Sequence, residues 1–247
     1  MSRTDLSIPT PDGNARAFAF TPNEGDGPWP GVIFFMDGPA IRPALFEMSE
    51  RLASHGYYVL LPDMFWRLGP YDPIDLKSIR DDAHRREIFG KFFASTDPER
   101  STRDTAAFLA FLSAQPEVKG ERVGVTGYCM GGALALRAAG SFPERVVAAA
   151  AFHGGNLATD AETSPHLLAS QIKARVLVAG ADEDRGFDDA QCERLDAAMK
   201  AAGVDAEVTI YRGAKHGYAP PDMPVYNVEA SERHWRELVA LLDGTLK

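Results

Sequence analysis

The chain has 247 residues and a formal net charge of −9, a balance that disfavours binding to nucleic acids and to anionic membrane surfaces. Its 45% hydrophobic and 25% charged residues are typical of a globular protein, and the length suits one α/β domain over residues 1–247. The chain contains no run of about 18 apolar residues, the length needed to cross a bilayer. Its first residues also lack the apolar segment of a signal peptide, so we expect none.

The two cysteines, Cys129 and Cys192, are too few for a disulfide framework. Reduced cysteines are typical of the cytoplasm. We therefore expect a cytoplasmic protein that is a monomer or a small homo-oligomer.

Apolar strands and amphipathic helices alternate from the start of the chain. Residues 14–20 alternate in polarity as a strand does, and residues 32–36 and 57–62 are short apolar runs typical of strands buried on both faces. Between those two runs, residues 42–56 have the apolar spacing of a helix, which we expect to end at Gly56.

Residues 64–100 are less regular and rich in aromatic, proline and charged residues. We expect this segment to form short helices that cover a pocket. Its aromatic side chains are candidates for apolar pocket walls: Phe65, Trp66, Tyr71, Phe89, Phe92 and Phe93.

The second half of the chain repeats the alternation of strands and helices. Such alternation predicts a mostly parallel sheet covered by helices on both faces, with ligands at the carboxyl ends of the strands. The predicted elements are a helix over 101–115, strands over 122–126, 146–152, 175–180 and 206–211, and a C-terminal helix over 229–244.

The sequence "GYCMGG" follows the strand 122–126 and precedes an alanine-rich helix. Its Gly-x-Cys-x-Gly spacing is that of a nucleophile elbow with cysteine in the serine position. The helix N-terminus would favour a Cys129 thiolate, and the backbone N–H of Met130 would be one oxyanion donor. Without this context, Cys129 would be interpreted as a small buried hydrophobic residue.

A thiol nucleophile needs a base, and His216 follows the strand 206–211. His153 also follows a strand and is the alternative, but the chain order nucleophile, acid, histidine favours His216. The acid is expected after the strand 175–180, where spacing alone leaves three candidates: Asp182, Glu183 and Asp184.

The loop "DGPAIRP" follows the strand 32–36. The N–H of Gly38 would be the second oxyanion donor. Asp37 would lie near the nucleophile, where a carboxylate tends to keep a thiol protonated, or it would simply be a turn residue. We expect no metal and no cofactor, because neither ligand spacing nor a phosphate-binding loop is present in the sequence.

These motifs resemble the dienelactone hydrolase family of α/β-hydrolases over nearly the whole chain, from "PWPGVIFFMDGPAIRP" through "GYCMGG" to "AKHGY". The resemblance implies an α/β-hydrolase fold and places the acid on Asp184. It therefore implies a triad of Cys129, His216 and Asp184 that hydrolyses a small-molecule ester or lactone through an acyl-enzyme. A thioesterase, another acyl hydrolase, or a small-molecule binding protein with little turnover are the alternatives.

The chain departs from this family at two positions. Members that cleave dienelactones have a glutamate at the position of Asp37, and an arginine that binds the substrate carboxylate at the position of Pro220. Spacing places a second carboxylate-binding arginine of the family near Arg86. An uncharged or differently charged ester or lactone therefore fits at least as well as a dienelactone that carries a carboxylate.

Overall fold

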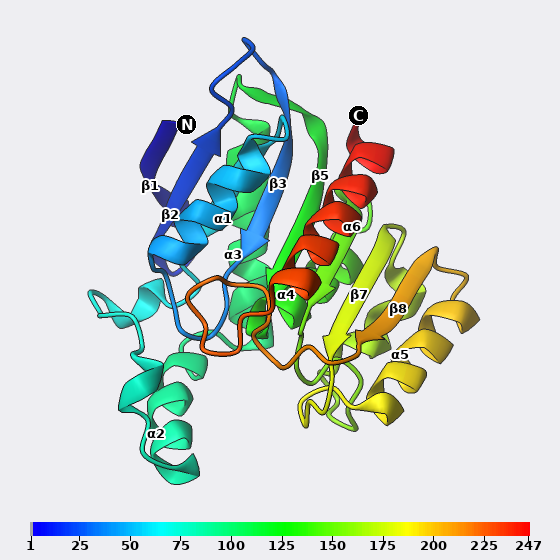
Figure 1. Cartoon of the computed structure of the whole chain (residues 1–247). Coiled ribbons are helices and arrows are strands. Elements are labelled where there is room, and N and C mark those ends of the chain that lie inside the picture. Colours follow the sequence, from blue (N-terminus) through cyan, green and yellow to red (C-terminus); the bar gives the residue numbers. More distant parts are fainter. Residues whose placement is uncertain (1) are drawn as a thin grey trace.

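Residues 2–247 are described by the computed structural model, and their strands form one sheet in the order β1-β2-β4-β3-β5-β6-β7-β8 (Figure 1). β1, β2 and β4 pair antiparallel, whereas every pair from β4 to β8 is parallel. The bounds are β1 (Ser2–Thr10), β2 (Gly13–Thr21), β3 (Trp29–Phe35), β4 (Tyr58–Pro62), β5 (Val118–Tyr128), β6 (Val146–Phe152), β7 (Arg175–Ala181) and β8 (Ala206–Tyr211).

Helices cover both faces of the sheet. α1 and α6 lie on one face and α3 and α4 on the other (Figure 1), which confirms the predicted architecture. None of the helices described is long and apolar enough to cross a membrane. The helices are α1 (Pro43–Ala53), α2 (Asp82–Phe93), α3 (Pro98–Ser113), α4 (Met130–Ser141), α5 (Asp189–Ala201) and α6 (Val228–Leu246), with 3-10 turns η1 (Trp66–Leu68), η2 (Leu76–Ser78) and η3 (Pro165–Gln171).

The central strands form because their apolar runs can be buried on both faces. All residues of β4 are buried, and those of β6 are buried except one. β6 is the sequence VVAAAAF, and its small side chains lie between α4 and α6. A Cβ on Gly124 in β5 would come within 2.5 Å of the Leu242 side chain, so α6 also packs closely on the sheet.

The N-terminal strand β1 was not predicted from the sequence. It pairs with β2 along its whole length, from Ser2 opposite Thr21 to Thr10 opposite Gly13. Only Ile8 of its nine residues is buried. An edge strand of this kind lacks the continuous apolar run that marks the central strands.

The turn from β5 into α4 depends on close contacts between backbones. A Cβ on Gly127 would lie 1.9 Å from the carbonyl oxygen of Gly131, and a Cβ on Gly131 would lie 2.3 Å from that of Phe35. Cys129, between these glycines, has a φ of 54°, in the region that side chains disfavour. The glycines thus allow β3, β5 and α4 to meet where Cys129 is displayed.

We predict that Gly127→Ala destabilises the protein by at least about 3 kcal/mol, because the added methyl group would overlap backbone atoms that cannot move aside. Gly90→Ala in α2 is the matched control, since nothing lies within 4 Å of its added Cβ. In a helix this change should raise stability by about 0.5–1 kcal/mol. Urea unfolding of both variants checks the prediction, and equal stabilities would contradict it.

Candidate active site

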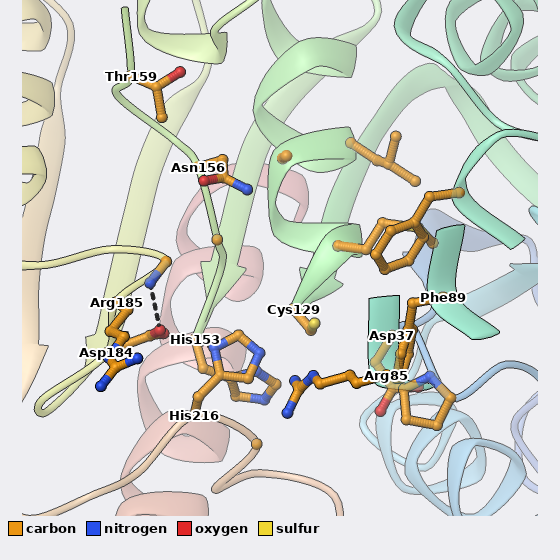
Figure 2. A pocket seen from close by; sticks show the side chains of 18 of the residues that line it. Asp37, Arg85, Phe89, Cys129, His153, Asn156, Thr159, Asp184, Arg185 and His216 are labelled. Carbon is orange, nitrogen blue, oxygen red and sulfur yellow. Dashed lines mark hydrogen bonds and ion pairs between the residues drawn. The ribbon is translucent and has the colours of Figure 1, made fainter. Parts of the chain in front are cut away.

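A cavity of about 1300 Å³ opens at the carboxyl ends of the parallel strands. The loops after β3, β5, β6, β7 and β8 line it, together with residues of α2 and α4. Figure 2 shows Asp37, Cys129, His153, Asp184 and His216 around this cavity. The site therefore lies where a parallel α/β sheet is expected to bind its ligand.

Cys129 lies between β5 and α4, and its side chain is partly exposed to the cavity. Its backbone N–H donates to the Phe152 carbonyl at 3.1 Å, which fixes the corner to β6. The N–H of Gly38 is directed at the Cys129 sulfur. Met130 is the first residue of α4, where backbone N–H groups have no partner within the helix. Both predicted oxyanion donors thus lie beside the thiol.

His216 is held by Asp184. Its Nδ1 lies 2.6 Å from Asp184 Oδ2, and Asp184 Oδ1 accepts the backbone N–H of Gly186 at 2.8 Å. The hydrogen bond between His216 and Cys129 therefore uses the other ring nitrogen, Nε2. The three side chains form one continuous chain from carboxylate to thiol.

This arrangement favours a thiolate paired with an imidazolium. Burial alone would raise the pKa of the Cys129 thiol, but the charge and hydrogen bond of His216 lower the pKa below its ordinary value. Burial would lower the pKa of His216, yet the neighbouring Cys129 and Asp184 raise that pKa to about 10. Each group stabilises the charged form of the other.

Hydrogen bonds distinguish the three acids that spacing left as candidates for the partner of His216. Asp182 is bonded elsewhere, because it accepts from Arg212 at 3.0 Å and from the Gly213 N–H at 2.9 Å, and Glu183 has no hydrogen bond to His216 among the described residues. Asp184 is thus the acid of this loop that bonds to His216.

Among the side chains that the structure describes, no group of three or more His, Cys, Asp or Glu could hold a metal ion.

His153, the alternative base, lies beside His216 with ring centroids 5.3 Å apart. Its side chain is 1% exposed, and neither ring nitrogen has a hydrogen-bond partner among the described residues. No described carboxylate orients the ring of His153 as Asp184 orients that of His216. The geometry therefore favours His216 as the base.

Asp37 is buried and paired with a residue that was not singled out in the sequence. Arg42 donates to both Asp37 oxygens, at 2.6 and 2.9 Å, and to both Asp222 oxygens, at 2.6 and 3.0 Å. Burial raises the pKa of Asp37, whereas the guanidinium of Arg42 opposes that rise. Arg42 thus joins the loop that carries Gly38 to the loop that follows His216.

Residues 64–100 contribute only part of the expected aromatic wall. Phe89 and Phe93 of α2 line the cavity, and Arg85 and Arg86 of the same helix line it too. The other four aromatic residues are not on the cavity wall: Phe65, Phe92 and Tyr71 pack on one another, and Trp66 donates to Asp104. The side chain of Arg85 extends into the cavity toward His216 (Figure 2).

The parallel sheet, with a cysteine at the sharp turn between a central strand and its helix, has the architecture of an α/β-hydrolase. Comparison with known proteins identifies the family more closely, because the model of the dienelactone hydrolase family matches residues 15–246. The chain therefore belongs to the dienelactone hydrolase family, a family of hydrolases.

Individual relatives are distant but cover nearly the whole chain. A "Putative carboxymethylenebutenolidase" of Methylorubrum extorquens is 27% identical over 237 residues, which are 95% of this chain and 78% of that protein. The crystal structure of a "Putative Dienelactone Hydrolase" from Klebsiella pneumoniae has a TM-score of 0.85 at 23% identity and covers 98% of both chains. The dienelactone hydrolase-like promiscuous phosphotriesterase P91, from metagenomic libraries, has a TM-score of 0.80 at 25% identity and covers 100% of both chains.

We predict that Asp37→Asn moves the pH midpoint of Cys129 alkylation to lower pH. The charge of Asp37 raises the pKa of the Cys129 thiol, so its removal lets the thiolate form at lower pH. The measurement is the rate of iodoacetamide alkylation against pH, in a Cys192→Ser background so that only one thiol reacts.

Asp222→Asn is the matched control, because it also removes one carboxylate from Arg42. Asp222 is 41% exposed, so solvent screens its charge and the midpoint should move less. An equal shift in both variants, or a shift to higher pH in Asp37→Asn, would contradict the assignment.

Proposed function

We propose that this protein hydrolyses small-molecule esters or lactones through a covalent acyl-enzyme on Cys129. The observation that carries the proposal is the continuous contact from Asp184 through His216 to the thiol of Cys129. A thiolate is the nucleophilic form of cysteine, and the raised pKa of His216 keeps a proton ready for the leaving group.

The reaction has two steps. The Cys129 thiolate attacks the carbonyl carbon, and the leaving-group oxygen departs with the proton from His216 Nε2, which leaves a thioester. His216 then takes a proton from a water molecule, the hydroxide formed attacks the thioester, and cleavage of the C–S bond releases the acid product and restores the Cys129 thiolate beside the protonated His216. Asp184 keeps the imidazole oriented and stabilises its charged form in both steps.

Negative charge develops on the carbonyl oxygen in both steps. The backbone N–H groups of Met130 and Gly38 are the donors that we assign to that oxygen, because they lie beside the nucleophile.

We predict that Cys129→Ala and His216→Ala each lower kcat for 4-nitrophenyl acetate by at least about 1000-fold, because nucleophile and base act as one unit. Cys192→Ala is the control for the loss of a cysteine, since Cys192 lies in α5 outside the cavity lining. With the wild type, mass spectrometry after rapid acid quench should find an acetyl group on the peptide that contains Cys129.

Turnover that survives in both Cys129→Ala and His216→Ala would exclude this mechanism. A panel of lactones, oxygen esters and thioesters then identifies the substrate class. Stabilisation against heat by a panel compound that gives no product would indicate the binding protein instead.

We expect residues of α2 to determine whether the site prefers a charged or an uncharged substrate. The position of the family's carboxylate-binding arginine is Pro220, and two arginines of α2 line the cavity. Family spacing indicates Arg86, whereas the orientation of Arg85 in Figure 2 supports Arg85. We therefore assign carboxylate binding to this pair, with Arg85 as the first residue to test.

We predict that Arg85→Gln lowers kcat/KM for 4-nitrophenyl hemisuccinate by about 10- to 100-fold, because a hydrogen bond from a charged donor to the substrate carboxylate is lost. Arg86→Gln is the matched control on the same helix and should have a smaller effect. The uncharged 4-nitrophenyl butyrate shows whether the loss is specific to charge. Equal losses for both esters in Arg85→Gln would contradict the assignment.

A further inference from the structure

The guanidinium of Arg137 is a positive charge in the cavity wall that the proposed mechanism does not use. Arg137 lies in α4, is half-buried and lines the cavity. Its described hydrogen bond runs from Nη2 to the backbone carbonyl of Thr163. The Nε and Nη1 atoms have no described partner, and solvent reaches both of them. These N–H groups are therefore free to bind a ligand.

No carboxylate neutralises this charge among the residues that the structure describes. Asp160, in the loop that carries Thr163, pairs with Arg194 at 2.7 Å. Glu162, beside Thr163, makes no ion pair with Arg137. Burial lowers the pKa of Arg137, and no described acid acts in the opposite direction. A partly buried charge without a partner is costly, and an anionic ligand would remove that cost.

The same imbalance of charge extends over the whole cavity. Its other basic lining residues also have no ion pair with a described carboxylate, namely Arg85, Arg86, Arg185 and Lys215. Of the four described acids in the lining, three are already paired: Asp37 with Arg42, Asp182 with Arg212 and Asp184 with His216. An acidic chain thus has a cavity with an excess of positive charge, which favours an anionic ligand.

Arg137 and Cys129 lie at opposite ends of one face of α4. The residues of this helix that line the cavity follow the spacing of a single helical face: Met130, Ala133, Leu134 and Arg137. Arg137 is eight residues after Cys129, so their Cα atoms are separated by about 12 Å along the helix axis. An anion on Arg137 would therefore stand well apart from the carbonyl that Cys129 attacks.

We propose that Arg137 binds a carboxylate that a spacer separates from the ester or lactone carbonyl of the substrate. This inference rests on the proposed function and adds a substrate class to it, namely esters or lactones with a charged end on a long chain. Arg85, whose side chain extends toward His216 (Figure 2), would instead meet a carboxylate close to the reacting carbonyl. The length of the spacer therefore distinguishes the two sites.

The test uses 4-nitrophenyl half-esters of dicarboxylic acids of increasing length, from succinate through adipate and suberate to sebacate. Each is compared with the ester in which a primary amide replaces the free carboxylate, which keeps the shape and removes the charge. For the wild type we expect kcat/KM to favour the acid over the amide by about tenfold at the suberate length, the effect of hydrogen bonds from a charged donor.

A second pair of esters places the charge on the leaving group. These are the acetate esters of 6-(4-hydroxyphenyl)hexanoic acid and of its amide, compared by the release of acetate. A preference for the acid in this pair assigns the remote carboxylate to the leaving group, whereas a preference in the first series assigns it to the acyl chain. Ratios near one for this pair and for every half-ester longer than succinate would overturn the proposal.

Variants show whether Arg137 is the residue responsible. Arg137→Gln should lower the acid-to-amide ratio toward one for the long esters and much less for the hemisuccinate, and Arg85→Gln should have the opposite dependence on length. Arg137→Lys keeps the charge without the planar fork and should retain part of the preference. Arg236→Gln, on the exposed side of α6 and outside the cavity lining, removes the same charge and should leave the ratio unchanged. An unchanged ratio in Arg137→Gln would overturn the proposal.

A binding measurement separates this inference from the proposed function. Isothermal titration calorimetry gives the Kd of suberate for Cys129→Ala and for the double variant Cys129→Ala, Arg137→Gln. We expect the double variant to bind suberate about tenfold more weakly, whereas the uncharged diamide of suberate should distinguish the two proteins little. This loss supports the site even if Cys129 proves not to be the nucleophile. Equal Kd values would exclude the site even if the wild type hydrolyses esters through Cys129.

Discussion

The backbone corner at Cys129 is the constraint on which the site depends. A φ of 54° is unfavourable for a cysteine, and it persists because β3, β5 and α4 meet there through Gly127 and Gly131 with no room for a side chain. The same contact brings the N-terminus of α4 and the Gly38 N–H to the sulfur. Packing of the sheet therefore determines both the exposure and the electrostatic environment of the thiol.

An acidic chain must also keep its carboxylates from opposing a thiolate. Asp184 is bonded to His216, so its charge stabilises the imidazolium instead of acting on the sulfur alone. Asp37 disfavours the thiolate, because its buried charge raises the pKa of the Cys129 thiol. Arg42 offsets this charge while Asp222 shares the guanidinium, so the pairing with Arg42 sets how far the thiolate is favoured.

The central strands, the elbow and the bond between Asp184 and His216 were predictable because each leaves a local pattern, or a family pattern, in the sequence. β1 left none, since only Ile8 of its mostly exposed residues is buried. Arg42 stands five residues after Asp37, a spacing that could have indicated a local ion pair. Asp222 is 180 residues from Arg42, so only the fold brings these two side chains together.

Backbone strain is the other property that the sequence does not display. The five non-glycine residues with positive φ among residues 2–247 all lie in loops after β3, β5, β6 or β7: Ala40, Cys129, His153, Asn156 and Glu183. Strained positions of this kind concentrate at functional sites, where surrounding contacts hold them. Cys129 is one of them, and the proposed mechanism accounts for its exposure. The positive φ of His153 and Asn156 is likewise held by backbone hydrogen bonds, to the carbonyls of Ala179 and Gly186, so contacts with β7 and the loop after it fix the loop after β6 beside the nucleophile.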